Sequence, residues 1–190
     1  METRKEVDII KSVLGCDRNS YALLVETYKV PIFNLAYRMT GSYEDANDLS
    51  QETFVKAFEN LERFDQEKKF FVWLYTIGLN IIRNHLKREQ KIRSRAFPEN
   101  DDLPLFDNHS NPEDALINDQ RALQLNRCLH SLADPLKEAV VLRFYQDLSF
   151  EEIAEISGLS LSAAKMRAYR GLEKLRRLME EDPVVPDKSP

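Results

Sequence analysis

Residues 149–178, SFEEIAEISGLSLSAAKMRAYRGLEKLRRL, predict two helices joined by a tight turn. Ser149 and Glu152 have the three-residue spacing of a capping box, in which each side chain bonds the other residue's backbone N–H. Gly158 stands where the chain must turn, because glycine enters the left-handed conformation without steric cost. Ser160 follows as the expected cap of the second helix. The stretch is therefore typical of a helix-turn-helix.

The second of these helices is apolar on one side and basic on the other. Three- and four-residue steps predict a buried face made of Leu161, Ala164, Ala168, Leu172 and Leu175. The opposite face carries Ser162, Ala163, Lys165, Met166, Arg167 and Arg170. Small residues followed by guanidinium groups suit a helix that lies in the major groove, so we expect this face to bind DNA. The alternative is a solvated, charged helix at the end of a bundle.

The charge of the chain is unevenly distributed. A formal net charge of −5 argues against a general nucleic-acid coat protein, so any DNA binding must be local. Residues 83–95 hold six basic residues and one acid, whereas residues 96–120 hold seven acids and neither Lys nor Arg. The acidic segment at 96–120 therefore lies between two basic stretches, residues 83–95 and the helix-turn-helix.

Several classes of protein are disfavoured by what the sequence lacks. Two cysteines without a CxxC companion and three scattered histidines predict neither a metal site nor any other cofactor. The sequence has no phosphate-binding glycine loop and no nucleophile elbow, so we do not expect an enzyme. The apolar run at 70–82 is too short to span a bilayer, and the N-terminus lacks a signal peptide. We therefore expect a cytoplasmic protein without membrane insertion.

The chain shows helical periodicity nearly throughout, which predicts an all-α fold of two small helical domains. The first domain covers 1–95, an acidic flexible linker covers 96–112, the second domain covers 113–182, and a tail covers 183–190. The expected helices span 4–14, about 20–41 with a break or kink at Pro31, 43–61, 70–95, 113–131, 135–146, 149–157 and 160–179. The side chains expected to face inward include Val7, Ile10, Val13, Leu14, Trp73, Leu136, Val140 and Phe144.

The first domain carries a more specific resemblance. YEDANDLSQETFVKAFENLERFD at 43–65 and FFVWLYTIGLNIIRNHLKR at 70–88 resemble region 2 of bacterial RNA polymerase sigma factors of the small extracytoplasmic-function group. SLADPLKEAVVLRFYQDLSFEEIAEISGLS at 131–160 resembles region 4 of the same group. The likeness covers roughly residues 5–178 and implies a sigma factor that directs core polymerase to promoters.

The resemblance also implies roles for particular residues. The positions that contact the clamp helices of the largest polymerase subunit are Asn47, Asp48, Gln51 and Glu52, which could otherwise be a solvated acidic face. The positions that bind and open the −10 element are Arg63, Lys68, Lys69, Asn80, Arg83, Asn84, Lys87 and Arg88. The face with Lys165 and Arg167 would read the −35 element, and the second domain would also bind the flap of the second-largest subunit.

Two further expectations come only from this kinship. The acidic segment would thread through the polymerase cleft, although it could equally be a simple tether. A cognate anti-sigma factor would hold the protein inactive. Where many relatives read GTVKSR, residues 162–167 read SAAKMR, which leaves the promoter sequence open. The competing hypothesis is a regulator that binds duplex DNA alone, and a requirement for core polymerase would discriminate between the two.

Overall fold

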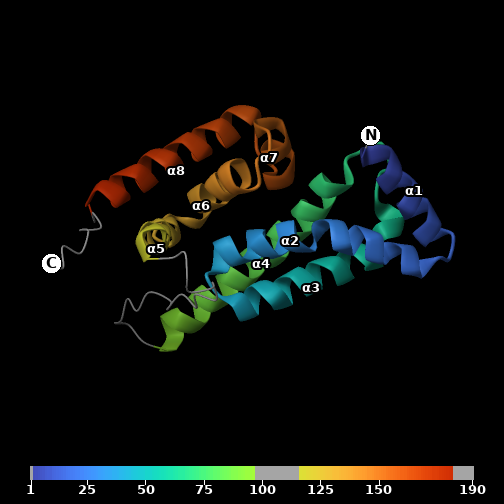
Figure 1. The fold of residues 1–190 in the computed structure, drawn as a ribbon, viewed down its shortest axis with the longest axis horizontal. Helices are drawn as coiled ribbons and strands as arrows, with labels where there is room; N and C mark the ends of the chain where they lie inside the picture. Colours follow the sequence, from blue (N-terminus) through green and yellow to red (C-terminus); the bar gives the residue numbers. More distant parts are fainter. Residues whose placement is uncertain (1, 97–115, 182–190) are drawn as a thin grey trace.

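The computed structural model describes residues 2–96 and 116–181, and every regular element in this part of the chain is helical. In chain order the elements are α1 (Glu2–Leu14), η1 (Arg18–Ser20), α2 (Tyr21–Thr40), α3 (Tyr43–Glu59), η2 (Leu61–Arg63), α4 (Phe70–Ala96), α5 (Leu116–His130), α6 (Asp134–Val140), η3 (Val141–Tyr145), α7 (Phe150–Ser157) and α8 (Leu161–Glu181). Helices α1–α4 form one group and α5–α8 another, which lies along one side of the first (Figure 1). The all-α prediction with two helical domains is confirmed. The tail and all but the first residue of the expected linker lie outside the described residues.

In the first group, α3 packs closely against both α2 and α4. Ser42 caps α3 by accepting a hydrogen bond of 3.1 Å from the backbone N–H of Asp45. Gly78 allows α4 to approach α3, because a Cβ at this position would lie 3.2 Å from the Thr53 methyl group. The rings of Phe64, Phe70 and Trp73 meet at centroid distances of 5.2–5.7 Å where α4 begins. These contacts fix the direction in which the polar side of α4 points.

Helix α2 continues through Pro31 as one element, so of the predicted break or kink the break is wrong. Proline removes only one N–H from the helix ladder. Beyond it the helix buries Ile32, Leu35, Ala36 and Met39, and this apolar burial outweighs the lost hydrogen bond. The helix ends where predicted, at Gly41, which has a φ of 78°.

In the second group, α8 lies directly against α6. The contact is made at Gly171, where a Cβ would lie 2.6 Å from Val140 Cγ2 and 3.0 Å from the carbonyl oxygen of Leu136. Helix α6 then passes into a wider π turn, η3, in which the N–H of Gln146 donates to the carbonyl of Val141 at 3.1 Å. The single helix predicted over 135–146 is therefore two elements with different pitch.

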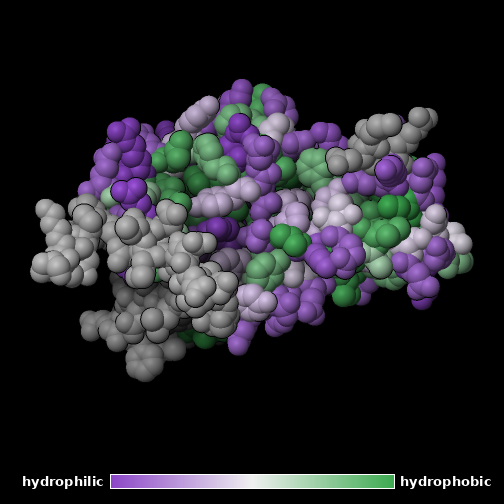
Figure 2. Space-filling view, viewed as in Figure 1, coloured by the Kyte–Doolittle hydropathy of each residue, from purple (hydrophilic) through white to green (hydrophobic). Residues whose placement is uncertain are grey.

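Four side chains predicted to face inward are exposed. Leu14 is 40%, Phe144 47%, Leu161 39% and Leu172 40% exposed, so these assignments are wrong. Phe144 leaves the core because the wide turn changes the phase of the helix. The buried residues of α8 are Ala164, Ala168, Gly171 and Leu175, without Leu161 and Leu172. Figure 2 shows a largely hydrophilic surface over α8 and a hydrophobic group towards the end of the molecule where α1 lies.

Within residues 2–96 and 116–181, no helix is both long enough and apolar enough to cross a membrane.

Candidate polymerase and nucleic-acid surfaces

The α3 residues predicted to contact polymerase lie together on the outer side of that helix. All four side chains, which we call the polymerase face, are exposed: Asn47, Asp48, Gln51 and Glu52. The other side of α3 is buried through Ala46, Leu49, Thr53 and Ala57. Tyr21 fixes the far end of α3 by donating a hydrogen bond of 2.8 Å to the carbonyl of Phe54. The polymerase face is therefore a rigid, acidic, solvent-facing surface on one well-packed helix.

The residues predicted to bind the −10 element, here called the basic face, fall into two parts. Asn80, Arg83, Asn84, Lys87 and Arg88 follow one another at helical spacing along one side of α4, and all but the half-buried Arg83 are exposed. Arg63, Lys68 and Lys69 lie before α4 begins, and all three are exposed. Asn84, Lys87 and Arg88 form no side-chain hydrogen bond or ion pair with another described residue, so their polar groups face solvent.

Arg83 is paired with a carboxylate from the second group of helices. Its Nε and Nη2 donate to the two oxygens of Glu138 at 2.9 and 2.7 Å, a bidentate arrangement. Ser157 donates to the same carboxylate at 2.7 Å. The Glu138 side chain is 6% exposed, so these donors take the place of water around its oxygens. Sequence reasoning missed this partner, because nothing in a single sequence links two charges 55 positions apart.

The lysines before α4 pair with helix α7. Lys69 Nζ lies 2.6 Å from Glu152, and Lys68 Nζ lies 3.5 Å from Glu155. Glu152 also completes the predicted capping box: its backbone N–H donates to Ser149 Oγ at 3.2 Å, while the Ser149 N–H donates to its carboxylate at 2.9 Å. Partial burial favours the neutral carboxyl, but the hydrogen bonds from Lys69 and Ser149 prevail and lower the pKa of Glu152.

The helix-turn-helix forms as the sequence predicts. Gly158 ends α7 with a φ of 68°, and the N–H of Leu159 returns to the carbonyl of Ala154 at 2.8 Å. Ser160 caps α8 by accepting from the N–H of Ala163 at 3.2 Å. These local bonds set the angle at which α8 leaves α7.

The residues predicted to read the −35 element lie on the outer side of α8. We call them the recognition face: Ser162, Ala163, Lys165, Met166, Arg167 and Arg170, of which only Ala163 and Arg167 are half-buried. Lys165 lies over the Phe150 ring, with its Nζ 5.8 Å from the ring centre. Arg143 donates to the Leu148 carbonyl at 2.9 Å.

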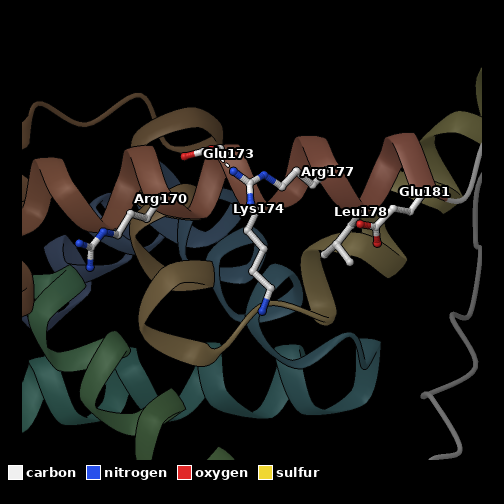
Figure 3. A pocket seen from close by; sticks show the side chains of 6 residues that line it. All are labelled: Arg170, Glu173, Lys174, Arg177, Leu178 and Glu181. Atoms are coloured by element: carbon white, nitrogen blue, oxygen red, sulfur yellow. Dashed lines mark hydrogen bonds and ion pairs between the residues drawn. The ribbon is translucent and has the colours of Figure 1, made fainter.

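Beyond the recognition face, α8 stays charged to its end. Figure 3 shows a depression there lined by Arg170, Glu173, Lys174, Arg177, Leu178 and Glu181, with an ion pair between Glu173 and Arg177. Both signs of charge line this depression. Arg170 and Lys174 are exposed and point away from the axis of α8 (Figure 3), so they suit contact with a phosphate backbone better than a small-molecule site.

The described residues hold no group of three His, Cys, Asp or Glu side chains that could bind a metal ion. Cys16 is exposed and Cys128 is buried, and neither forms a disulfide bond within the described residues. His130 packs against Gly41: a Cβ on that glycine would lie 3.0 Å from the imidazole. Burial, together with Lys137 and Arg38, lowers the pKa of His130 to about 4.

The comparisons with known proteins agree with this geometry. The profile of sigma-70 region 2 matches residues 24–92, and the profile of sigma-70 region 4 matches residues 122–175. RNA polymerase sigma factor YlaC of Bacillus subtilis is 34% identical over 162 residues, which are 85% of this chain and 93% of YlaC. The extracytoplasmic-function (ECF) RNA polymerase sigma factor SigW of the same organism is 29% identical over 178 residues, which are 90% of this chain and 95% of SigW.

A solved structure has the same fold. It contains the sigma factor RpoE of Bartonella quintana in complex with the anti-sigma factor NepR, and the match has a TM-score of 0.65 at 22% identity. The match covers 86% of this chain and 98% of that chain. Together with the two profiles and the two relatives, these findings identify the chain as a member of the extracytoplasmic-function group of sigma-70 factors, which bind core RNA polymerase and direct initiation at specific promoters.

Proposed function

We propose that this sigma factor acts through three separate surfaces. The polymerase face binds the clamp helices of the largest subunit, the basic face binds and opens the −10 element, and the recognition face reads the −35 element in the major groove. One observation supports this division above all. The residues at the matching positions of the family motifs are solvent-facing, apart from the half-buried Ala163, Arg167 and Arg83. Those that lie on α3, α4 and α8 are opposite the buried sides of these helices.

The proposal assigns residues 1–95 to polymerase binding and −10 recognition, and residues 113–182 to −35 recognition and to the flap of the second-largest subunit. The acidic segment 96–112 connects them and passes through the polymerase cleft. We assign no catalytic step and no cofactor to the chain, and we place it in the cytoplasm with the polymerase. Binding energy then drives strand opening, because amide and cationic side chains along α4 hold the separated strand.

We also propose that an anti-sigma factor controls the protein. The support is the RpoE structure, in which that sigma factor is bound by NepR. Such a partner would cover the polymerase face or the basic face, since both must be free for initiation.

The deciding experiment is run-off transcription from a randomised promoter library with bacterial core polymerase, with and without this protein. We expect paired −35 and −10 motifs to be enriched only when the protein is present. Selection of duplex sites by the protein without polymerase, and no gain in initiation with it, would favour a stand-alone regulator instead.

The polymerase face is tested by Glu52→Lys. We expect weaker binding to core polymerase with an unchanged melting temperature, because a cation replaces an exposed carboxylate. Glu26→Lys is the matched control: Glu26 is exposed on α2, where its partner is Lys29 at 2.6 Å. Fluorescence anisotropy with labelled protein measures both affinities. Equal affinities for the two variants would refute the assignment of Glu52.

The recognition face is tested by Arg167→Ala, with Arg176→Ala as control because Arg176 lies farther along α8 and bonds Glu180 at 2.8 Å. If Arg167 contacts a base pair through two hydrogen bonds, promoter selectivity falls by about 1–3 kcal/mol. Holoenzyme affinity for the enriched promoter and for random DNA measures this. An equal loss on both DNAs would make Arg167 a phosphate contact.

A further inference from the structure

Met166 is an exposed, apolar side chain in the middle of the recognition face. The residue is 47% exposed. Because successive residues of an α-helix are about 100° apart around its axis, Met166 lies almost directly opposite the buried residues Ala164 and Leu175. These two residues face the protein core, so under the proposed function the opposite side of α8 faces DNA. Met166 is therefore placed to reach farthest into the major groove.

The first half of the recognition face has an apolar centre. Ala163, about one turn before Met166, adds only a methyl group. The polar neighbours have partners elsewhere: Ser162 Oγ lies 3.1 Å from the hydroxyl group of the residue that caps α8, and Lys165 Nζ lies 5.8 Å from the centre of the Phe150 ring on α7. The methyl group of Ala163 and the thioether of Met166 therefore form the apolar centre of this surface.

Cations lie on both sides of this apolar centre. Lys165 comes directly before Met166 and Arg167 directly after it, so the two cations lie on opposite sides of α8. Arg170 lies on the same side as Arg167, is exposed and points away from the axis (Figure 3). Cations in these places suit the phosphates that border the groove, which position a protein on the duplex. The charge around the apolar centre therefore favours DNA as its partner.

Apolar contact distinguishes thymine from the other bases. In the major groove every base edge presents hydrogen-bond donors or acceptors, and thymine adds a C5-methyl group. Methionine offers only a weak acceptor sulfur, so a donor or acceptor pressed against Met166 loses its water without gaining a good partner. A thymine methyl group in the same place exchanges water for an apolar surface, which is favourable. Met166 is therefore suited to select thymine.

We propose that Met166 contacts the C5-methyl group of a thymine in the −35 element, with the Ala163 methyl group beside it. The inference rests on the proposed function of the recognition face and adds the base that this face selects. Met166 then determines specificity: it contributes where the DNA carries the methyl group, and it disfavours a cytosine, guanine or adenine edge at the same place.

The test uses the full chain with bacterial core polymerase and the promoter that the run-off selection enriches. Each thymine of the −35 element, on either strand, is replaced singly by deoxyuridine, which removes the methyl group but keeps the base pair. We expect one replacement to weaken holoenzyme binding by about fourfold, the effect of losing one buried methyl-sized group. With cytosine at that position, 5-methylcytosine should bind about fourfold more tightly than cytosine itself. Fluorescence anisotropy with labelled duplexes measures the affinities.

Two substitutions at one position show whether Met166 detects the methyl group. Leucine and glutamine are both good helix formers, but only leucine is apolar. Met166→Leu should keep the fourfold preference for thymine over deoxyuridine, and Met166→Gln should lose it. The control is Leu172→Gln, because Leu172 is 40% exposed on the same helix but lies nearer its buried side, and it should keep the preference. Melting curves check that all variants are folded. The proposal is overturned if no thymine shows the preference, or if Met166→Gln keeps it.

The Arg167→Ala variant separates failure of this inference from failure of the proposed function. If Arg167→Ala lowers promoter selectivity but no thymine methyl group matters, the recognition face contacts the −35 element and the assignment of Met166 is wrong. If neither Arg167→Ala nor Met166→Gln changes selectivity between the enriched promoter and random DNA, the proposed −35 role of the recognition face is wrong, and thymine recognition falls with it. The same conclusion follows if the selection enriches no −35 motif.

Discussion

Gly171→Ala tests how closely α8 lies against α6. The added Cβ would meet Val140 Cγ2 at 2.6 Å and the Leu136 carbonyl oxygen at 3.0 Å. Neither neighbour moves easily: Val140 is a buried, β-branched residue with few rotamers, and the carbonyl belongs to the backbone of α6. The substitution therefore forces α8 away from α6 by a few tenths of an ångström or strains both helices.

The expected magnitude is a balance of two effects. Alanine is favoured over glycine in a helix interior by about 1 kcal/mol. Overpacking a dense contact costs about 1–3 kcal/mol, so we expect a net loss in the free energy of unfolding of about 1 kcal/mol. Urea denaturation of the full chain, followed by far-ultraviolet circular dichroism, measures this difference.

A second substitution isolates the cause. Val140→Ala removes the methyl group at 2.6 Å, so Gly171→Ala should cost less in that background than in the parent. We expect a coupling energy of about 1 kcal/mol between the two sites, as for residues in direct contact. A stabilising Gly171→Ala in the parent, or a cost that does not depend on residue 140, would refute the steric reasoning.

Two other expectations concern His130 and the α7 cap. Because the pKa of His130 is lowered to about 4 while the unfolded chain titrates near 6.5, the unfolded state binds more protons between these values. Stability is therefore fully present above about pH 6.5 and falls by about 2 kcal/mol between pH 7 and pH 5. In His130→Asn the urea midpoint should depend much less on pH between pH 7 and pH 5. If the variant shows the same dependence as the parent, the pH effect does not come from His130. Ser149→Ala removes the acceptor of the Glu152 N–H and should cost about 1 kcal/mol in urea denaturation, whereas a neutral result would show that water replaces the cap.

The features that the sequence predicts best are those decided by neighbouring residues. Ser149, Gly158 and Ser160 act on backbone groups a few positions away, and the structure confirms all three. The predicted ends of α2 and α4 fall within about a residue of the observed ones, because the caps and the apolar periodicity agree there.

The features that the sequence could not predict depend on distant partners. A Cβ at Gly171 would meet atoms of α6, a helix about 30 residues away in sequence. The pairing of Arg83 with Glu138 likewise depends on how the two domains pack. Phe144 shows a third kind of error. The four-residue spacing of Leu136, Val140 and Phe144 predicts one buried face only in a regular α-helix. The π turn interrupts that helix, and its sequence contains no proline or glycine that would predict the interruption. The functional roles of the three surfaces remain predictions from family motifs.

The π turn at Val141–Tyr145 also makes the chain unusually tolerant of a one-residue deletion at that point. Such a turn holds one residue more than the corresponding α turn. Deleting one residue there would restore an ordinary helical turn, and the side chains beyond it would keep nearly the same direction around the axis. Leu148 would stay in the core, and α7 and α8 would keep their orientation. A one-residue deletion within the regular part of α6 would instead rotate every side chain beyond it by about 100°.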